Sequence, residues 1–238
     1  MGIMQPYFPT EMAIKLAKIA GIDTFIETGT YMGGTTKYAS IHFKEVHTIE
    51  LSEALYNSVK DELLAKGNIT PHLGDSRDVL PEILKNINDN IIFWLDGHYS
   101  AGITAGKDDP CPLLRELEII LSRDNDDIIL IDDARSLLDG EGWPTIVQLY
   151  KKINSIAMKK KYLVMCDDNL YIVPDEDEYI ELLLSYTLER NVFLWNKDFS
   201  LRNQSKKRSK KDSAVKLLKK VGLYKFARMI YRSIKKNK

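Results

Sequence analysis

The sequence predicts an α/β protein built on a doubly wound, mainly parallel sheet of seven strands with an antiparallel C-terminal hairpin. Short apolar runs alternate with helical patterns along the first two thirds of the chain, and the connections between them are short. Two more strand-like runs then follow each other almost directly. With 238 residues, 44% of them hydrophobic, the chain is long enough for one domain with a small appendage.

The elements can be assigned in order along the chain. We expect a helix at 10–20 capped by Thr10, and then a short buried strand at 23–27. Further strands are expected at 45–50, 69–74, 91–95 and 127–131, and further helices at 34–42, 52–66, 78–87, 113–121 and 143–155. Pro144 suits the first turn of the last of these helices. The final strands, 161–166 and 169–173, are separated by Asp167-Asp168, a pattern typical of a tight hairpin.

The formal net charge of zero conceals two oppositely charged segments. Residues 202–238 contain 15 Lys and Arg and one acid, which gives +14 and leaves −14 for residues 1–201. We therefore divide the chain into a domain at 1–200 and a basic tail at 201–238. Apolar residues recur at helical spacing from 213 to 235, so the tail is predicted to form a basic amphipathic helix.

Such a helix suits an anionic membrane surface, which is the partner we expect for residues 202–238. Packing on the acidic body or in a homodimer is the main alternative, and the sequence disfavours nucleic acid. No apolar run reaches the roughly 18 residues of a membrane span. The first ten residues do not have the pattern of a signal peptide. We expect a cytoplasmic protein, peripheral at the inner membrane face if the tail binds lipid.

Acidic residues lie at or just after the ends of the first five predicted strands. They are Glu27, Glu50, Asp75, Asp96 and Asp132 with Asp133. In a doubly wound sheet this edge binds ligands. One acid here is an ordinary helix cap, but five would repel one another unless ligands or cations satisfied them.

A glycine-bearing turn follows the first strand. Gly29, Gly33 and Gly34 would let a ligand approach the backbone and the start of the next helix. Tyr31 occupies the middle position of the G-x-G-x-x-G pattern, which counts against a nicotinamide enzyme.

The residues at and after the ends of the first three predicted strands resemble the first three motifs of the class I S-adenosylmethionine (SAM)-dependent methyltransferases. They are Glu27-x-Gly29-x-x-x-Gly33, Glu50 and Gly74-Asp75-Ser76. The Rossmann-like fold of these enzymes also ends in a strand hairpin. The likeness covers about residues 10–175. It implies that Glu27 and Gly29 lie near the methionine part of the cofactor, that Glu50 holds the ribose, and that Asp75 and Ser76 meet the adenine. The cofactor-binding residues we expect are Glu27, Gly29, Thr30, Tyr31, Gly33, Thr35, Glu50, Asp75, Ser76 and Asp96.

Asp96 and the pair Asp132-Asp133 resemble the acidic residues of metal-dependent O-methyltransferases of the catechol and macrocin type. The resemblance implies that Asp96, Asp132 and Asp133 hold Mg²⁺, which would lower the pKa of the attacking hydroxyl. His98 stands where the macrocin-like branch has an acidic base, so it is the expected general base, with Asp96 beside it in the catalytic set. Two alternatives to these roles remain. Asp132 and Asp133 could cap a helix, and His98 could be a metal ligand or a surface residue.

A loop of about 15 residues follows Asp96, and loops of this length in compact domains are usually functional or disordered. We interpret it as a lid over the acceptor. The candidate substrate residues are Tyr99, Ser100, Thr104, Arg135 and Trp143.

The sequence therefore predicts a Mg²⁺-assisted, SAM-dependent O-methyltransferase that acts on a hydroxyl of a sugar or glycan precursor, in polysaccharide biosynthesis. One alternative is a metal-independent methyltransferase acting on another small molecule. Another is a non-catalytic protein of the same fold that binds membrane or RNA through its tail.

Overall fold

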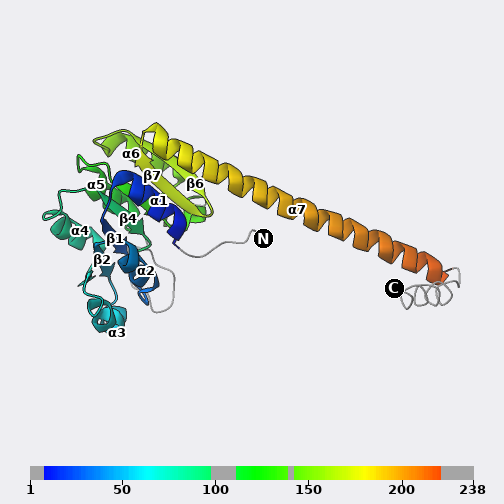
Figure 1. The fold of residues 1–238 in the computed structure, drawn as a ribbon, viewed down its shortest axis with the longest axis horizontal. Coiled ribbons are helices and arrows are strands. Elements are labelled where there is room, and N and C mark those ends of the chain that lie inside the picture. Colours follow the sequence, from blue (N-terminus) through cyan, green and yellow to red (C-terminus); the bar gives the residue numbers. More distant parts are fainter. Residues whose placement is uncertain (1–7, 98–110, 139–141, 221–238) are drawn as a thin grey trace. The chain divides into compact units, whose positions relative to one another are not determined.

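The computed structural model describes residues 8–97, 111–138 and 142–220 (Figure 1). Its strands are β1 (Thr24–Thr28), β2 (Glu45–Glu50), β3 (Ile69–Leu73), β4 (Ile91–Leu95), β5 (Ile128–Ile131), β6 (Lys161–Cys166) and β7 (Asn169–Pro174). Its helices are α1 (Thr10–Ala20), α2 (Gly34–His42), α3 (Glu53–Leu64), α4 (Ser76–Leu84), α5 (Leu113–Leu121), the short 3-10 helix η1 (Ala134–Leu137), α6 (Ile146–Ile156) and α7 (Asp177–Lys220).

The seven strands form one sheet in the order β3-β2-β1-β4-β5-β7-β6. The first five strands run parallel, and β7 is antiparallel to both β5 and β6. In the turn between β6 and β7, Asp167 and Asp168 have positive φ values of 52° and 72°, as a two-residue hairpin turn of this kind requires. The predicted α/β sheet and its terminal hairpin are confirmed.

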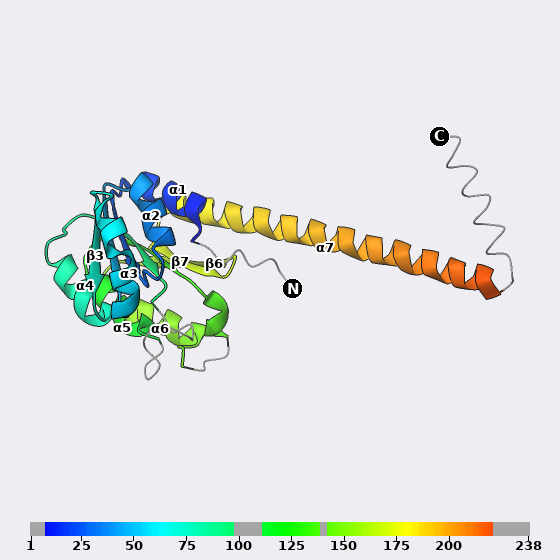
Figure 2. The same ribbon diagram turned by 90° about the horizontal axis from the view of Figure 1, so that it is seen from below.

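Helices cover both faces of the sheet (Figures 1 and 2). Apolar side chains from α1, α2, α3 and the start of α7 pack in one cluster with Phe25, Trp94 and Tyr171 of the sheet. A second cluster joins α4, α5 and α6 to the opposite face, around Phe93 and Ile129. Because β4 is buried on both faces, its five residues are all apolar, as the sequence predicted.

Several predicted helix starts differ from the structure. Pro9 is the N-cap of α1 and Thr10 is its first residue, so the expected Thr10 cap is wrong. Helix α6 begins after Thr145, whose side chain forms a capping box with Gln148. Pro144 therefore lies outside the helix, because the capping box sets the helix start at Ile146, three residues later than predicted.

Helix α7 is the largest difference from the sequence analysis, which expected a helix only from residue 213 onward. It runs without a break from Asp177 to Lys220. The chain divides into two compact units, residues 1–187 and 188–238, so the helix belongs partly to each. Tyr179 and Leu183 are buried in the first unit. Within the described part of the chain, no helix combines the length and apolar content that crossing a membrane requires.

Candidate functional site

The turn after β1 passes close to the carboxyl end of β4. Gly29 has a φ of +88°, and a Cβ atom built on it would lie 2.4 Å from the carbonyl oxygen of Asp96. The Asp96 N–H donates to the carbonyl oxygen of Thr28 over 3.0 Å. Glycine is thus required at position 29 both for its backbone conformation and for space. The close approach places Asp96 directly beside this turn.

Tyr31 lies in the same turn, at the middle position of the G-x-G-x-x-G pattern. Its φ is +46°, in the left-handed region that costs an ordinary L-residue about 1–2 kcal/mol. Its N–H donates to Oε2 of Glu50 over 2.9 Å, and its side chain is 53% exposed. The tyrosine therefore accepts a strained conformation that keeps its N–H on the Glu50 carboxylate.

Glu50 is a buried carboxylate at the end of β2 with a fixed orientation. Oε2 accepts the Tyr31 N–H, and Oε1 accepts the Ser52 N–H over 2.8 Å. A carboxylate oxygen has a second lone pair, so both oxygens can accept another hydrogen bond. The arrangement suits two adjacent hydroxyl groups. Ser52 was not among the predicted site residues.

Glu27 lies beneath this turn and is only 1% exposed. Its Oε2 accepts hydrogen bonds from the hydroxyls of Thr48, over 2.7 Å, and of Thr36. Burial, helped by the negative charges of Asp96 and Glu50 and opposed by the two hydroxyl hydrogen bonds, raises the pKa of Glu27 to about 8. Glu27 therefore holds a proton at neutral pH, which relieves repulsion among the three acids.

The Thr48 hydroxyl also lies 2.6 Å from the hydroxyl of Thr30, so Thr30 joins the same network. Thr36 and Thr48 were missed by the sequence analysis. Thr48 is paired with Glu27 across β1 and β2, and that partnership depends on the register of the strands.

The first turn of α2 faces the same edge of the sheet. Gly33 precedes the helix with a φ of +70°, and no side chain caps the N-terminus of α2. The helix N–H groups there are therefore not taken by a capping side chain, which is the usual condition for anion binding at a helix start. Thr35 lies half-buried in this turn.

Asp75 and Ser76 follow β3, as predicted. Asp75 is the N-cap of α4, and its Oδ1 accepts the Arg77 N–H over 2.9 Å. The Arg77 guanidinium also donates to both carboxylate oxygens, over 2.9 and 2.6 Å, and holds the pKa of Asp75 below its usual range. A purine bound here would have to share Asp75 with Arg77. Ser76 is buried.

The predicted Mg²⁺ ligands are not supported by their surroundings. Asp133 pairs with the Arg135 guanidinium over 2.6 Å, and Arg135 also pairs with Asp168. Oδ1 of Asp132 accepts the N–H of Asp133. The described residues contain no group of three or more His, Cys, Asp or Glu side chains placed to hold a metal ion. The donor set of Asp96, Asp132 and Asp133 therefore does not fit a Mg²⁺ site, because an arginine neutralises one of the three carboxylates.

Arg135 was predicted to contact the substrate. In the structure its guanidinium pairs with the carboxylates of Asp133 and Asp168, so a substrate would compete with these two ion pairs. Trp143 is half-buried against the second apolar cluster. The remaining predicted residues of the acceptor side, His98, Tyr99, Ser100 and Thr104, lie outside the described residues.

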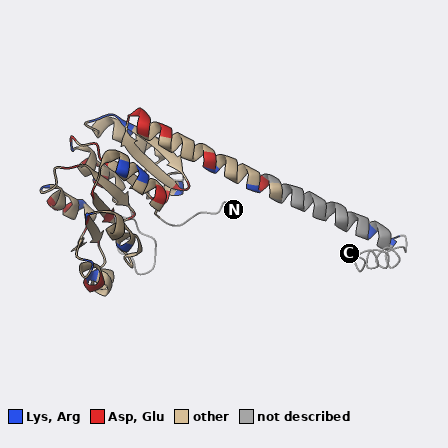
Figure 3. Cartoon of the chain, viewed as in Figure 1, with Lys and Arg blue, Asp and Glu red and all other residues tan. Residues whose placement is uncertain are grey.

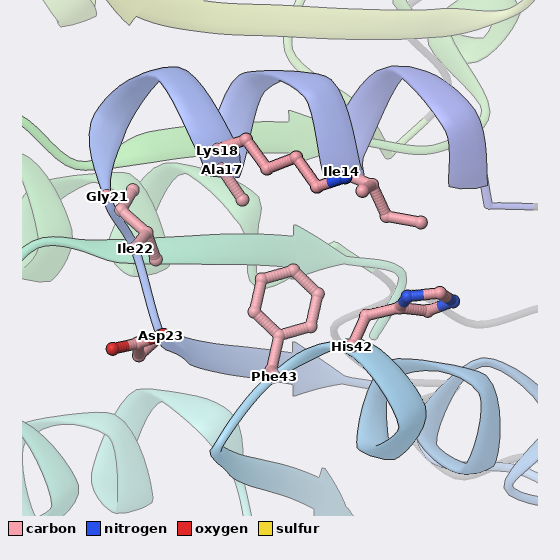
Figure 4. Close-up of a pocket in the computed structure, with 8 residues that line it drawn as sticks. All are labelled: Ile14, Ala17, Lys18, Gly21, Ile22, Asp23, His42 and Phe43. Carbon is pink, nitrogen blue, oxygen red and sulfur yellow. The ribbon is translucent and has the colours of Figure 1, made fainter.

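Two pockets are lined by residues other than the acids at the strand ends. One, of about 330 Å³, is lined by residues of α1, the α1–β1 connection and the end of α2 (Figure 4). Its Asp23 and Phe43 precede β1 and β2, so it lies at the opposite, amino end of these strands. The other, a groove of about 760 Å³, is lined by Trp143 and by residues of α5 and α6. Neither of these two pockets is lined by Glu27 or Glu50.

The sequence matches no family model and no curated protein. Among solved structures, it is similar to the O-methyltransferase TomG from Streptomyces achromogenes, which is involved in tomaymycin synthesis and was solved with SAM. The identity is 15%, the match covers 73% of this chain and 83% of TomG, and the TM-score is 0.47.

An O-methyltransferase from Bacillus cereus in complex with S-adenosylhomocysteine (SAH) is 16% identical. The match covers 70% of this chain and 82% of that protein, with a TM-score of 0.46. The SAH-bound methyltransferase PaMTH1 from Podospora anserina is 15% identical, with coverage of 70% and 78% and a TM-score of 0.45. All three of these similar structures are described as methyltransferases.

Proposed function

We propose that this protein is a SAM-dependent O-methyltransferase. The observation that carries the proposal is the buried Glu50 carboxylate, whose two oxygens are oriented by the N–H groups of Tyr31 and Ser52. Both oxygens retain a lone pair, which suits the adjacent hydroxyls of a ribose at the end of the second strand. The close-packed turn at Gly29 lies next to this carboxylate in the sheet.

The other residues of this edge suit the methionine part of SAM. Asp96 lies at the Gly29 turn, and its negative charge would favour the cationic ammonium and sulfonium groups of the cofactor. Glu27 is linked to this turn through Thr48, whose hydroxyl donates to Glu27 and lies 2.6 Å from the hydroxyl of Thr30. When bound, SAM supplies an electrophilic methyl group.

We further propose that His98 is the general base. It follows Asp96 by two residues in the sequence. A neutral imidazole there would accept the proton of the acceptor hydroxyl as the oxygen attacks the methyl group. No step in this proposal needs Mg²⁺, because the aspartates do not form a fitting donor set.

A sugar or glycan hydroxyl is the acceptor that we propose. The hydroxyl-bearing residues Tyr99, Ser100 and Thr104 lie within six residues of His98 in the sequence, and Trp143 borders the groove on α5 and α6. Hydroxyls and an aromatic surface are suited to a polyhydroxyl ring. Another small-molecule acceptor is the competing possibility.

The test is transfer of a labelled methyl group from SAM to a panel of sugar and catechol acceptors. We expect label on sugars, and a loss of about 10²–10⁴-fold in kcat for His98→Ala with unchanged SAH affinity, which is the range for general bases. His42→Ala, at the exposed end of α2, is the matched control and should keep full activity. Label found only on catechols would overturn the sugar proposal, and full activity of His98→Ala would overturn the assignment of the base.

A further inference from the structure

Helix α7 exposes a concentrated apolar segment in its middle. We call residues Leu188, Val192, Phe193, Leu194 and Trp195 the α7 apolar segment. Leu188, Val192 and Trp195 are 64%, 52% and 64% exposed, and their spacing of four and three residues places them on one face of the helix. Phe193 lies under the Arg190 guanidinium, whose carbon is 5.5 Å from the ring centroid. Such exposure is costly in water, so this part of the helix is suited to an apolar partner.

The charges along the helix indicate which partner fits. Within the apolar segment and just beyond it, the acids Glu189 and Asp198 are balanced by Arg190 and Lys197 (Figure 3). The following part of the helix, residues 202–220, contains nine Lys and Arg and one acid, a net charge of +8. An apolar segment with an exposed tryptophan is thus continuous with a strongly cationic helix.

We propose that α7 binds an anionic lipid surface, with the α7 apolar segment inserted at the headgroup level and residues 202–220 lying over the lipid phosphates. The lipid-binding region predicted from the sequence began only at residue 202, so the structure extends it toward the N-terminus. A parallel pairing with a second copy would place two segments of +8 side by side, which the Coulomb repulsion opposes. Nucleic acid would satisfy the charge but offers no apolar environment for Leu188 and Val192. The inference rests on α7 alone and is independent of methyl transfer.

The test is sedimentation of the full chain with vesicles of equal parts phosphatidylglycerol and phosphatidylcholine, compared with phosphatidylcholine alone. We expect binding to the anionic vesicles, with a blue shift of tryptophan emission that is absent in Trp195→Phe. Leu188→Gln with Val192→Gln should weaken binding about tenfold or more, since two buried aliphatic side chains are lost. Ile41→Gln, which changes an exposed aliphatic residue of the first unit, is the matched control and should bind normally.

Vesicle affinity should fall about a hundredfold or more when four lysines of the cationic part of α7 are replaced by Gln, because each cation at an anionic surface contributes roughly fivefold to the affinity. The four residues are Lys206, Lys207, Lys210 and Lys211. Circular dichroism checks that every variant keeps its helix content. Equal binding to both vesicle types, or none to either, would overturn the proposal. So would a concentration-dependent dimer that shields Trp195 without lipid, or an RNA oligonucleotide that displaces the vesicles and produces the same emission shift.

Discussion

Glu27 and Thr48 are direct neighbours on parallel strands β1 and β2, and the Thr48 hydroxyl donates to the Glu27 carboxyl group over 2.7 Å. The pair lies at the base of the turn that carries Gly29 and Tyr31. The hydrogen bond opposes the effect of burial on the pKa of Glu27, and the balance between the two leads to the first prediction.

The stability of the protein should fall as the pH rises toward about 8. Burial raises the pKa of Glu27 to about 8, above its ordinary value of 4.5, so the folded state holds a proton that the unfolded state releases. The stabilisation is complete below the unfolded pKa and is lost as the pH rises through the folded one, with a slope of up to about 1.4 kcal/mol per pH unit. Glu27→Gln removes this titration.

Urea unfolding across this pH range measures the effect. The wild type should lose stability between about pH 5 and 8 more steeply than Glu27→Gln, because only the wild type must ionise a buried acid. Parallel pH profiles for the two proteins would show that Glu27 is ionised in the folded state near neutral pH.

Gly29→Ala should disrupt the site, and Gly34→Ala should not. A Cβ at position 29 meets the Asp96 carbonyl oxygen at 2.4 Å with φ at +88°, whereas a Cβ at position 34 meets nothing within 4 Å. We expect Gly29→Ala to lose about 1–3 kcal/mol of stability and to bind SAH more weakly. Gly34→Ala, inside α2, should match the wild type or exceed it slightly. Equal stability of the two variants in urea unfolding would contradict the close approach of β1 and β4.

The protein should not bind Mg²⁺ at a specific site formed by Asp96, Asp132 and Asp133. Arg135 pairs with Asp133, so a cation would have to displace an existing ion pair. Isothermal titration with Mg²⁺ should give no saturable heat, and EDTA should leave turnover unchanged. Stoichiometric binding that disappears in Asp132→Asn would restore the Mg²⁺ site predicted from the sequence.

The sequence predicted the fold well where local patterns determine the structure. Three such predictions are confirmed by the structure: the buried strand at β4, the hairpin turn at Asp167-Asp168 and the tight turn that requires glycine at position 29. The α7 apolar segment was missed because only Leu188, Val192 and Trp195 share one face of the helix. Phe193 and Leu194 lie on other faces, so the sequence pattern forms no clean stripe. The pairing of Arg135 with Asp133 and Asp168 joins residues distant in sequence, so motif spacing alone did not reveal it.

The central claim is that Glu50 holds the ribose of SAM, and calorimetric titration with SAH tests it most directly. The wild type should show saturable binding. Glu50→Ala should lose about 1.5–3 kcal/mol of binding free energy, the range for charge-assisted hydrogen bonds. Glu53→Ala, an exposed acid in the first turn of α3, should bind as the wild type does. Absence of SAH binding by the wild type, or equal affinity of Glu50→Ala and the wild type, would contradict the claim.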